Sequence, residues 1–252
     1  MPISRKKGKS FAGRVNYISG ERVHDIHNNK TYGDERNDVV YYRVILPRNA
    51  PAELLDLQLY CDSIERAELR SDARTAREFI FSLPNELPLS EQIRIVERFV
   101  DNNFTLNGLS AIAAIHDKKN IKFPERDNPH AHVLVSTRTL GPDGFSKQKD
   151  REHDKKKYIA IWRMDLALTI NRTYARNGLD IRVSHKSLRE QGIYDREPLN
   201  HLSRNDWQLE QRGIHTDAGK KRRKIREHNR KLERTLPMER EIERELEMER
   251  SF

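Results

Sequence analysis

The sequence predicts an α+β protein, an α/β sandwich in which helices flank a mainly antiparallel central sheet and a charged helical tail follows. Side chains alternate between two faces over 130–136, the two-residue period of a strand. The run 109–116 is mostly apolar and indicates a second strand. Elsewhere apolar residues recur at steps of three and four, which is the period of amphipathic helices.

Length and charge limit the kind of protein. The 252 residues suffice for one sizeable α/β domain with an extension, and the formal net charge is +9. We expect a nucleic acid partner and no membrane insertion, because no apolar run approaches the ~20 residues of a membrane span. The single cysteine, Cys61, excludes an intrachain disulfide, and residues 1–7 lack the apolar stretch of a signal peptide. A cytoplasmic location is therefore expected.

In the first third of the chain, Ser10 is expected to cap a short helix that Gly20 ends. Residues 24–38 are expected to form a polar loop and 39–46 a strand. Pro51 is expected to open a helix over 51–74.

The middle of the chain alternates strands and helices. Residues 76–83 predict a strand that carries Glu78, and Ser90 is expected to cap a helix that ends at Gly108. Two further strands follow, at 109–116 and 130–136, and a charged loop over 117–127 separates them.

The last part begins with an expected flexible basic loop over 138–153, with a turn at 141–144. A helix is predicted over 155–176 and a short strand over 181–183. Apolar residues become scarce after Leu202, so we expect a globular domain over 1–203 and a solvated helical tail over 204–252. The tail holds a basic run at 220–224, and Ile242 and Leu246 lie one turn apart in it.

Three histidines form the strongest chemical pattern. His130 and His132 point to one face of their strand, ~6.6 Å apart along it. His116 ends the preceding strand, and it reaches the pair if the two strands form a hairpin. Three neutral imidazoles with coordination positions left open indicate a catalytic metal site. The alternative is that each histidine is an ordinary satisfied or solvated side chain.

Two further residues stand out less by themselves. Tyr17 falls on the last turn of its short helix among polar neighbours, where a tyrosine is usually an amphipathic surface residue. Glu78 places one carboxylate in a run otherwise built for burial, and a solvated edge-strand glutamate explains it equally well.

At this point the sequence resembles the MobA/MobL family, the plasmid mobilisation relaxases of the HUH endonuclease class. The resemblance runs over about 5–219. Five blocks in order make it specific, and they lie at 8–19, 76–87, 114–132, 180–202 and 212–217. They include the helix with Tyr17, the sequence Ala76-Arg77-Glu78-Phe79 and the sequence Asn128-Pro129-His130-Ala131-His132.

The resemblance implies cleavage of one strand of single-stranded DNA at a plasmid transfer origin. Tyr17 would attack the phosphate and form a reversible 5′-phosphotyrosyl link, so that the strand can be rejoined. His116, His130 and His132 would hold a divalent metal, Mg or Mn in the cell. Glu78 is expected to orient a metal-bound histidine or to move a proton near Tyr17. Accessory mobilisation proteins and a coupling protein are the expected partners.

DNA contacts and the family's other features complete the expectations. Arg138 and Lys147 follow the histidine strand and are predicted to contact the DNA backbone, although a solvated basic loop is the plainer interpretation.

Family members usually begin with a strand, and this chain leaves almost no room for it. Either translation starts upstream or the sheet lacks a strand. Nothing in the sequence supports a primase or helicase domain.

Two alternative functions remain open. A rolling-circle replication-initiator nuclease shares the His-x-His and tyrosine chemistry. A non-catalytic DNA-binding accessory protein of the same fold is the alternative from a different class.

Overall fold

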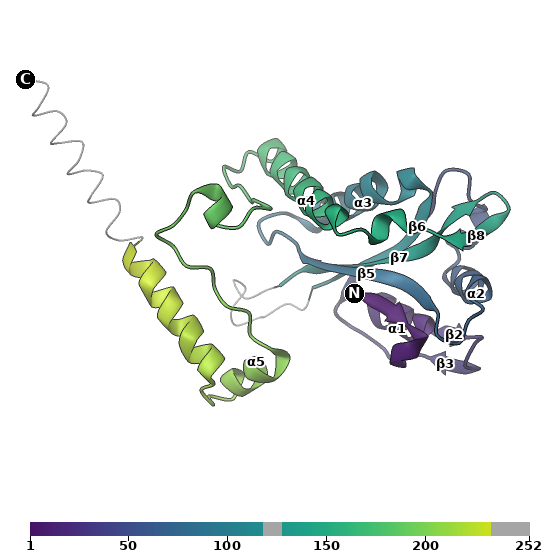
Figure 1. Cartoon of the computed structure of the whole chain (residues 1–252), viewed down its shortest axis with the longest axis horizontal. Coiled ribbons are helices and arrows are strands. Elements are labelled where there is room, and N and C mark those ends of the chain that lie inside the picture. Colours follow the sequence, from purple (N-terminus) through teal and green to yellow (C-terminus); the bar gives the residue numbers. More distant parts are fainter. Residues whose placement is uncertain (118–127, 233–252) are drawn as a thin grey trace, which may run out of the picture. The chain divides into compact units, whose positions relative to one another are not determined.

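A computed structural model describes residues 1–117 and 128–232, and it confirms the α+β architecture (Figure 1). The central sheet has six strands in the order β1-β5-β7-β6-β4, with β8 paired to β7. Every pairing among these strands is antiparallel. The strands are β1 (Pro2–Ser4), β4 (Val39–Ile45), β5 (Arg74–Ser82), β6 (Leu109–His116), β7 (His130–Gly141) and β8 (Gly144–Lys149).

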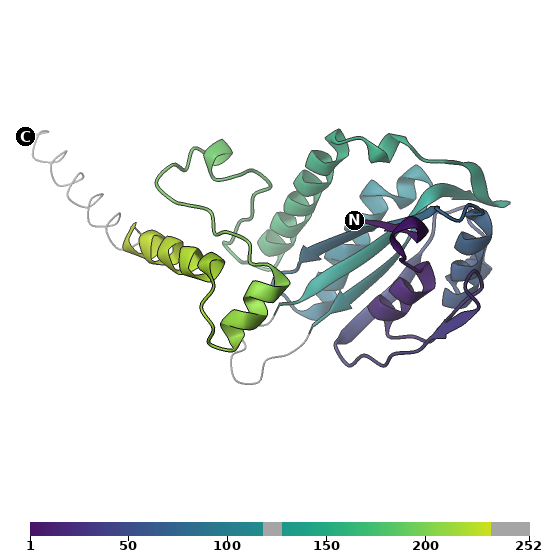
Figure 2. The same cartoon turned by 60° about the horizontal axis from the view of Figure 1, so that its bottom comes forward.

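Helices cover both faces of the sheet (Figures 1 and 2). One core contains residues of α1 (Phe11–Ser19) and α2 (Leu57–Ala67) packed with Ile112 and Leu134. The other contains residues of α3 (Leu89–Asn103) and α4 (Lys157–Arg176) packed with Ala113 and Val133. Neighbouring residues of β6 and β7 therefore enter different cores, and the even-numbered ones face α1.

The short helix α1 forms as the sequence predicts. The Ser10 side chain accepts the Gly13 N–H at 3.0 Å, and Gly20 ends the helix at φ +74°. Phe11, Val15 and Ile18 are buried, among other residues of the helix. Tyr17 stays 39% exposed on the outer side.

The polar loop expected over 24–38 is wrong in part, because β2 (Val23–Asp25) and β3 (Lys30–Tyr32) pair there as a two-stranded ribbon. The Asp25 carboxylate accepts the backbone N–H groups of His27 and Asn28 and so stabilises the turn. Strands of three residues are too short to show an alternating pattern in sequence.

The helix expected over 51–74 is also wrong in extent. A 3-10 turn, η2 (Ala52–Leu55), comes first, and the Asp56 side chain then caps α2 by accepting the Leu59 N–H at 2.8 Å. The helix α2 ends at Ala67, and β5 already begins at Arg74. The charged residues between them continue the helical period in sequence without being helical.

Helix α3 differs slightly from expectation at both ends. It begins at Leu89 after Pro88, so Ser90 lies inside the helix and is not its cap. It ends at Asn103, and a 3-10 turn, η3 (Thr105–Asn107), leads to Gly108 at φ +77°.

The flexible loop expected over 138–153 is wrong. Strand β7 continues to Gly141 and turns back into β8, with Leu140 opposite Phe145, and a 3-10 turn, η5 (Glu152–Asp154), follows. The turn expected at 141–144 is where the hairpin reverses. The segment 181–183 is not a strand, because the Asn171 side chain bonds both the N–H and the C=O of Val183.

The alternative that the sheet lacks an N-terminal strand is wrong as well. Strand β1 pairs with β5, with Ile3 opposite Ala76. Ile3 is buried in the α1 face of the core. The three residues of β1 thus pair with β5 and also bury the Ile3 side chain in the core.

The chain divides into two units, Met1–His185 and Lys186–Phe252. The second contains η6 (Arg189–Gln191), α5 (Arg204–Gln211) and a helix over 217–232 that includes the basic run. Ile242, Leu246 and nearly all of the loop expected over 117–127 lie outside the described residues. The boundary at 203 stays a prediction. Among the described helices, none combines the length and the apolar character that crossing a bilayer requires.

Phe104 tests the core on the α3 face. It is wholly buried, and its ring centroid lies 5.1 Å from that of Phe79 and 5.5 Å from that of Trp162. Phe104→Ala should lower the free energy of unfolding in urea by about 3–5 kcal/mol, because it leaves a cavity among rings. Leu106→Ala, at a position 77% exposed, should change it by less than about 0.5 kcal/mol. Equal losses in the two variants would contradict this packing.

Candidate active site

Three histidines meet at one end of β6 and β7. The two strands pair as predicted, and the antiparallel register sets His116 directly opposite His130. One ring nitrogen from each of His116, His130 and His132 lies within 4.8 Å of the other two. His116 and His132 are buried and His130 is partly exposed, so the cluster opens to solvent on one side.

Two of these rings are oriented by backbone carbonyls. His116 Nε2 lies 2.8 Å from the Ile18 carbonyl oxygen, and His130 Nδ1 lies 2.8 Å from the Asn128 carbonyl oxygen. A carbonyl oxygen only accepts, so these nitrogens carry the protons. The lone pairs are therefore left on His116 Nδ1 and His130 Nε2.

The third ring is oriented by a carboxylate. His132 Nδ1 donates to Glu78 Oε1 at 3.0 Å, which leaves the lone pair on Nε2. His132 Nε2 and His116 Nδ1 are both buried without a hydrogen-bond partner. Unpaired buried nitrogens are costly, and a ring whose other N–H is bonded to an oxygen is the usual form of a metal-binding histidine. This donor set fits a divalent metal.

The protonation of the cluster is consistent with that use. Burial lowers the pKa of His116 to about 4, and burial also lowers the pKa of His132. Both imidazoles are therefore neutral near pH 7, which is the form that binds a metal.

Glu78 is a buried, ionised carboxylate. It lies on β5 opposite Leu134 of β7, and it accepts hydrogen bonds from His132 and from Arg14 Nε, the latter at 2.9 Å. Burial would raise the pKa of Glu78, but the hydrogen bonds from His132 and Arg14 outweigh burial and hold it below the usual value. Glu78 therefore fixes His132 as an electrostatic partner.

Tyr17 lies beside the cluster. Its ring centroid is 5.7 Å from that of His116 and 5.9 Å from that of His132. A cleft of about 600 Å³ adjoins it, with Tyr17, Arg14, Arg36 and Glu78 among the lining residues. The structure thus brings together all five residues predicted for catalysis and metal binding: Tyr17, Glu78, His116, His130 and His132.

Sequence reasoning missed Arg14, Arg36 and Asp38. The guanidinium carbons of Arg14 and Arg36 lie 4.2 and 4.1 Å from the Tyr17 ring centroid. Arg14 could have been found, because it precedes Tyr17 by three residues on one helix face. Arg36 and Asp38 follow the short ribbon, and no local pattern marks them.

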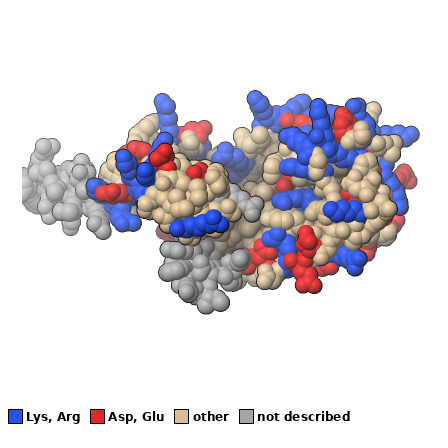
Figure 3. Space-filling model, turned by 90° about the horizontal axis from the view of Figure 1, so that it is seen from below, with Lys and Arg blue, Asp and Glu red and all other residues tan. Residues whose placement is uncertain are grey.

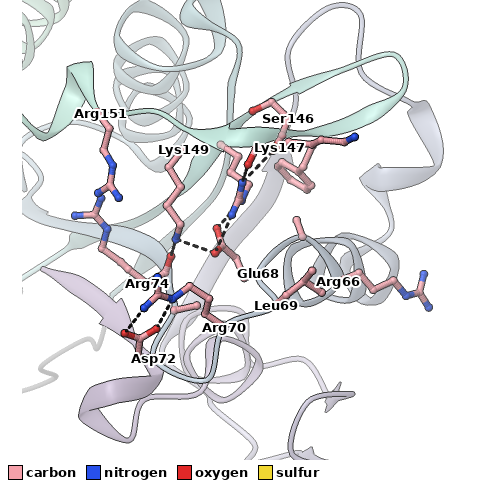
Figure 4. Close-up of a pocket in the computed structure, with 14 residues that line it drawn as sticks. Arg66, Glu68, Leu69, Arg70, Asp72, Arg74, Ser146, Lys147, Lys149 and Arg151 are labelled. Atoms are coloured by element: carbon pink, nitrogen blue, oxygen red, sulfur yellow. Dashed lines mark hydrogen bonds and ion pairs between the residues drawn. The ribbon is translucent and has the colours of Figure 1, made fainter.

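Arg138 and Lys147 lie elsewhere. Arg138 is six residues beyond His132 on β7, about 20 Å along the strand, so these two residues do not flank the histidines as predicted. They line a second cleft of about 750 Å³ between the α2–β5 connection and β8 (Figure 4). Its lining carries the cations Arg66, Arg70, Arg74, Arg138, Lys147, Lys149 and Arg151, against Glu68 and Asp72.

The second cleft is built on Glu68. This buried carboxylate accepts from Arg138 Nε at 2.9 Å. It also pairs with Lys149 Nζ at 2.7 Å (Figure 4). Arg138 therefore holds the hairpin while adding positive charge. Lys147 is exposed and forms no ion pair with a carboxylate within the described ranges 1–117 and 128–232. Figure 3 shows Lys and Arg side chains spread over the visible surface among Asp, Glu and uncharged residues.

Comparison with known proteins identifies the relatives of this chain. The model of the MobA/MobL family matches residues 9–212. This chain belongs to the MobA/MobL family. A probable mobilization protein MobA from Bifidobacterium longum is 33% identical over 152 residues, which cover 59% of this chain and 26% of that protein.

Other relatives agree. A mobilization protein MobL from Acidithiobacillus ferridurans is 26% identical over 80% of this chain and 60% of its own length. A conjugal transfer protein TraA from Agrobacterium fabrum is 26% identical, over 79% of this chain and 20% of its own length. The chain thus spans less than two thirds of each of these three relatives.

A solved structure shares the fold. It was determined in work on the molecular basis of vancomycin resistance transfer in Staphylococcus aureus, and it is 26% identical to this chain with a TM-score of 0.66. The match covers 74% of this chain and 95% of the other.

The histidine cluster predicts how stability depends on pH in metal-free protein. His116 takes up a proton near pH 6.5 when unfolded but only near pH 4 when folded, so the unfolded state binds more protons between these values. The thermal midpoint should therefore fall as pH drops from 6.5 to 4, and His132 should add to the fall.

His116→Gln should flatten that dependence, measured by circular dichroism with a chelator present. His24→Gln, at a histidine on β2 outside the cluster, is the control and should leave the slope unchanged. A slope that His116→Gln leaves intact would show that His116 is not the group that resists protonation.

Proposed function

We propose that this protein is a DNA relaxase that nicks one strand at a plasmid transfer origin and later rejoins it. The observation that carries the proposal is the position of Tyr17, beside three histidines that each bring one ring nitrogen within 4.8 Å of the other two, and next to an open cleft. The relatives named as mobilization and conjugal transfer proteins support this activity over replication initiation. The presence of Tyr17 together with His116, His130 and His132 argues against a purely DNA-binding accessory role.

In the proposed reaction, the Tyr17 phenol oxygen attacks the phosphorus of the scissile phosphodiester. The bond to the 3′ oxygen breaks, which leaves a free 3′-OH and a 5′-phosphotyrosyl link. The reverse attack by a 3′-OH rejoins the strand. Glu78 serves as a positioning residue in this scheme, because its Oε1 accepts from both His132 and Arg14 and so fixes both side chains.

His116, His130 and His132 would hold a divalent metal, and its positive charge would stabilise the phosphate as negative charge develops there. Nitrogen ligands suit Mn better than Mg, while abundance in the cell favours Mg. We propose that the metal bound in the cell is Mg or Mn. The protein's own contribution is to fix each imidazole in the tautomer that leaves its lone pair free.

The second cleft would bind the DNA backbone. Its lining has seven cations and two carboxylates, and Lys147 is exposed at its rim.

Single-stranded DNA is the proposed substrate, since a paired duplex resists turning the scissile phosphate into line with Tyr17. Accessory mobilisation proteins that open the duplex and a coupling protein are proposed partners, in the cytoplasm, with the nuclease domain over 1–203.

The nucleophile can be tested by removing one oxygen. Tyr17→Phe should retain binding of single-stranded oligonucleotides that tile the DNA beside its gene, but should form no covalent adduct with them. Adducts are measured by gel shift after denaturation, with a label at the 3′ end of the oligonucleotide, because the fragment downstream of the cut is the one joined to the protein. Tyr32→Phe is the control, because Tyr32 lines the same cleft but lies on β3 instead of α1.

A full-strength adduct in Tyr17→Phe would exclude Tyr17 as the nucleophile. Wild-type cleavage that persists undiminished in a chelator would exclude the metal. Equal nicking of linear, fully paired duplex would exclude the single-strand requirement.

Lys147 tests the DNA-binding cleft. Lys147→Ala should weaken oligonucleotide binding and reduce the slope of log K against log salt by about 0.7, the value for one phosphate contact on a single strand. Arg98→Ala, on the exposed face of α3, should change neither quantity. Arg138→Ala is unsuitable as the first test, because it also removes a partner of buried Glu68. A Lys147→Ala slope equal to wild type would place the DNA elsewhere.

A further inference from the structure

Two arginines lie against the Tyr17 ring, and each binds a carboxylate that lies beside the histidine cluster. The first is Arg14, whose guanidinium carbon lies 4.2 Å from the ring centroid. It donates to Glu78 Oε1 through Nε at 2.9 Å, and the same oxygen accepts the His132 N–H. Arg14 therefore joins Tyr17 to His132 through one buried oxygen atom.

The second is Arg36, whose guanidinium carbon lies 4.1 Å from the same centroid. It binds both oxygens of Asp38, through Nε at 2.9 Å and Nη2 at 2.6 Å. A two-point Arg–carboxylate contact fixes the plane of the guanidinium as well as its position. Hydrogen bonds to Asp38 raise the pKa of Arg36, and Tyr17 raises it further.

Asp38 is anchored to the same strand end as the histidines. Its backbone carbonyl accepts the Asp117 N–H at 2.8 Å, directly after the last residue of β6. Its Oδ2 lies 3.9 Å from His116 Nδ1, which is too long for a hydrogen bond. Asp38 thus places Arg36 beside the His116 end of the cluster, as Glu78 places Arg14 beside His132.

The need for such support follows from where Tyr17 lies. It is exposed on the last full turn of α1, and α1 ends two residues later. An exposed aromatic side chain there would sample several rotamers, whereas in-line attack on phosphorus needs one. Guanidinium groups over a ring are attracted to its face, so two of them restrict the ring.

We propose that Arg14 and Arg36 form an arginine clamp that fixes the Tyr17 ring for attack. Both are positioning residues, and Asp38 and Glu78 hold their guanidinium planes. The inference rests on the proposed function for its kinetic consequence. The ring geometry itself is independent of any activity.

The kinetic test uses Arg36→Gln, which removes the charge and the planar fork. Its single-turnover nicking rate at saturating oligonucleotide should fall at least tenfold, while the Kd for the oligonucleotide changes less than twofold. Asp38→Asn, which weakens the hold on Arg36, should give a smaller fall. Arg36→Lys should recover part of the rate because it restores the charge without the two-point contact.

The matched control is Arg43→Gln. Arg43 also forms an ion pair with a carboxylate, Glu97, at 2.6 Å, but it belongs to β4 and contacts the α3 side. It should leave the rate and Kd unchanged. Thermal midpoints of all variants are compared, and Asp38→Asn carries the test if Arg36→Gln does not fold.

A second measurement reports the ring without catalysis. With 3-fluorotyrosine at position 17, Arg36→Gln and Asp38→Asn should each shift and sharpen the ¹⁹F resonance as the ring gains motion, and Arg43→Gln should not. An unchanged resonance together with a wild-type rate would overturn the clamp. A raised Kd with an unchanged rate would also overturn it, because Arg36 would then be only a DNA contact. If wild-type protein forms no adduct, the proposed function fails, and the ¹⁹F result still decides the clamp.

Discussion

The antiparallel register between β6 and β7 is the constraint on which the rest of the site depends. It sets His116 opposite His130 and keeps both on the face covered by α1. A slip of one residue would turn one strand's histidines toward the aromatic core beneath α3 and α4. That slip is opposed by every apolar residue of both strands, since neighbours such as Ile112 and Ala113 are buried in different cores. Core packing therefore determines the geometry of the histidine cluster.

Buried carboxylates provide the second level of order. Glu78 holds His132 and Arg14 at one end of β7, and Glu68 holds Arg138 and Lys149 toward the other. Each would be costly to bury alone, and each accepts hydrogen bonds from two other side chains. The same device thus serves two purposes: it orients an imidazole in one place and fixes a cationic hairpin in another.

The sequence predicted what is periodic or local. Alternation in 130–136 and the apolar run 109–116 indicated the two strands, and the caps Ser10 and Gly20 located α1 correctly. The role of Tyr17 came only from the family resemblance, because a tyrosine on an exposed helical turn has no chemical signature of its own.

What sequence could not predict depends on contacts between distant residues. The β7–β8 hairpin was missed because Arg138, Lys147 and Lys149 give it a loop-like composition, and the pairing of Arg138 and Lys149 with Glu68 is invisible before folding. The helix expected over 51–74 was too long, because the charged residues near Glu68 also fit a helical period. Arg36 and Asp38 contact Tyr17 and the end of β6 across chain separations that no local pattern spans.

The hydrogen bonds of the histidine rings have a consequence for how an ion would come and go. Ile18, Asn128 and Glu78 hold the rings in place through groups that belong to the folded scaffold. An ion entering such a cage finds its ligands already assembled, so little folding energy is coupled to its arrival, unlike the case of a zinc finger. The ion would then behave as an exchangeable reagent, replaced from the surrounding pool without unfolding, and the occupant at any moment would follow the composition of that pool.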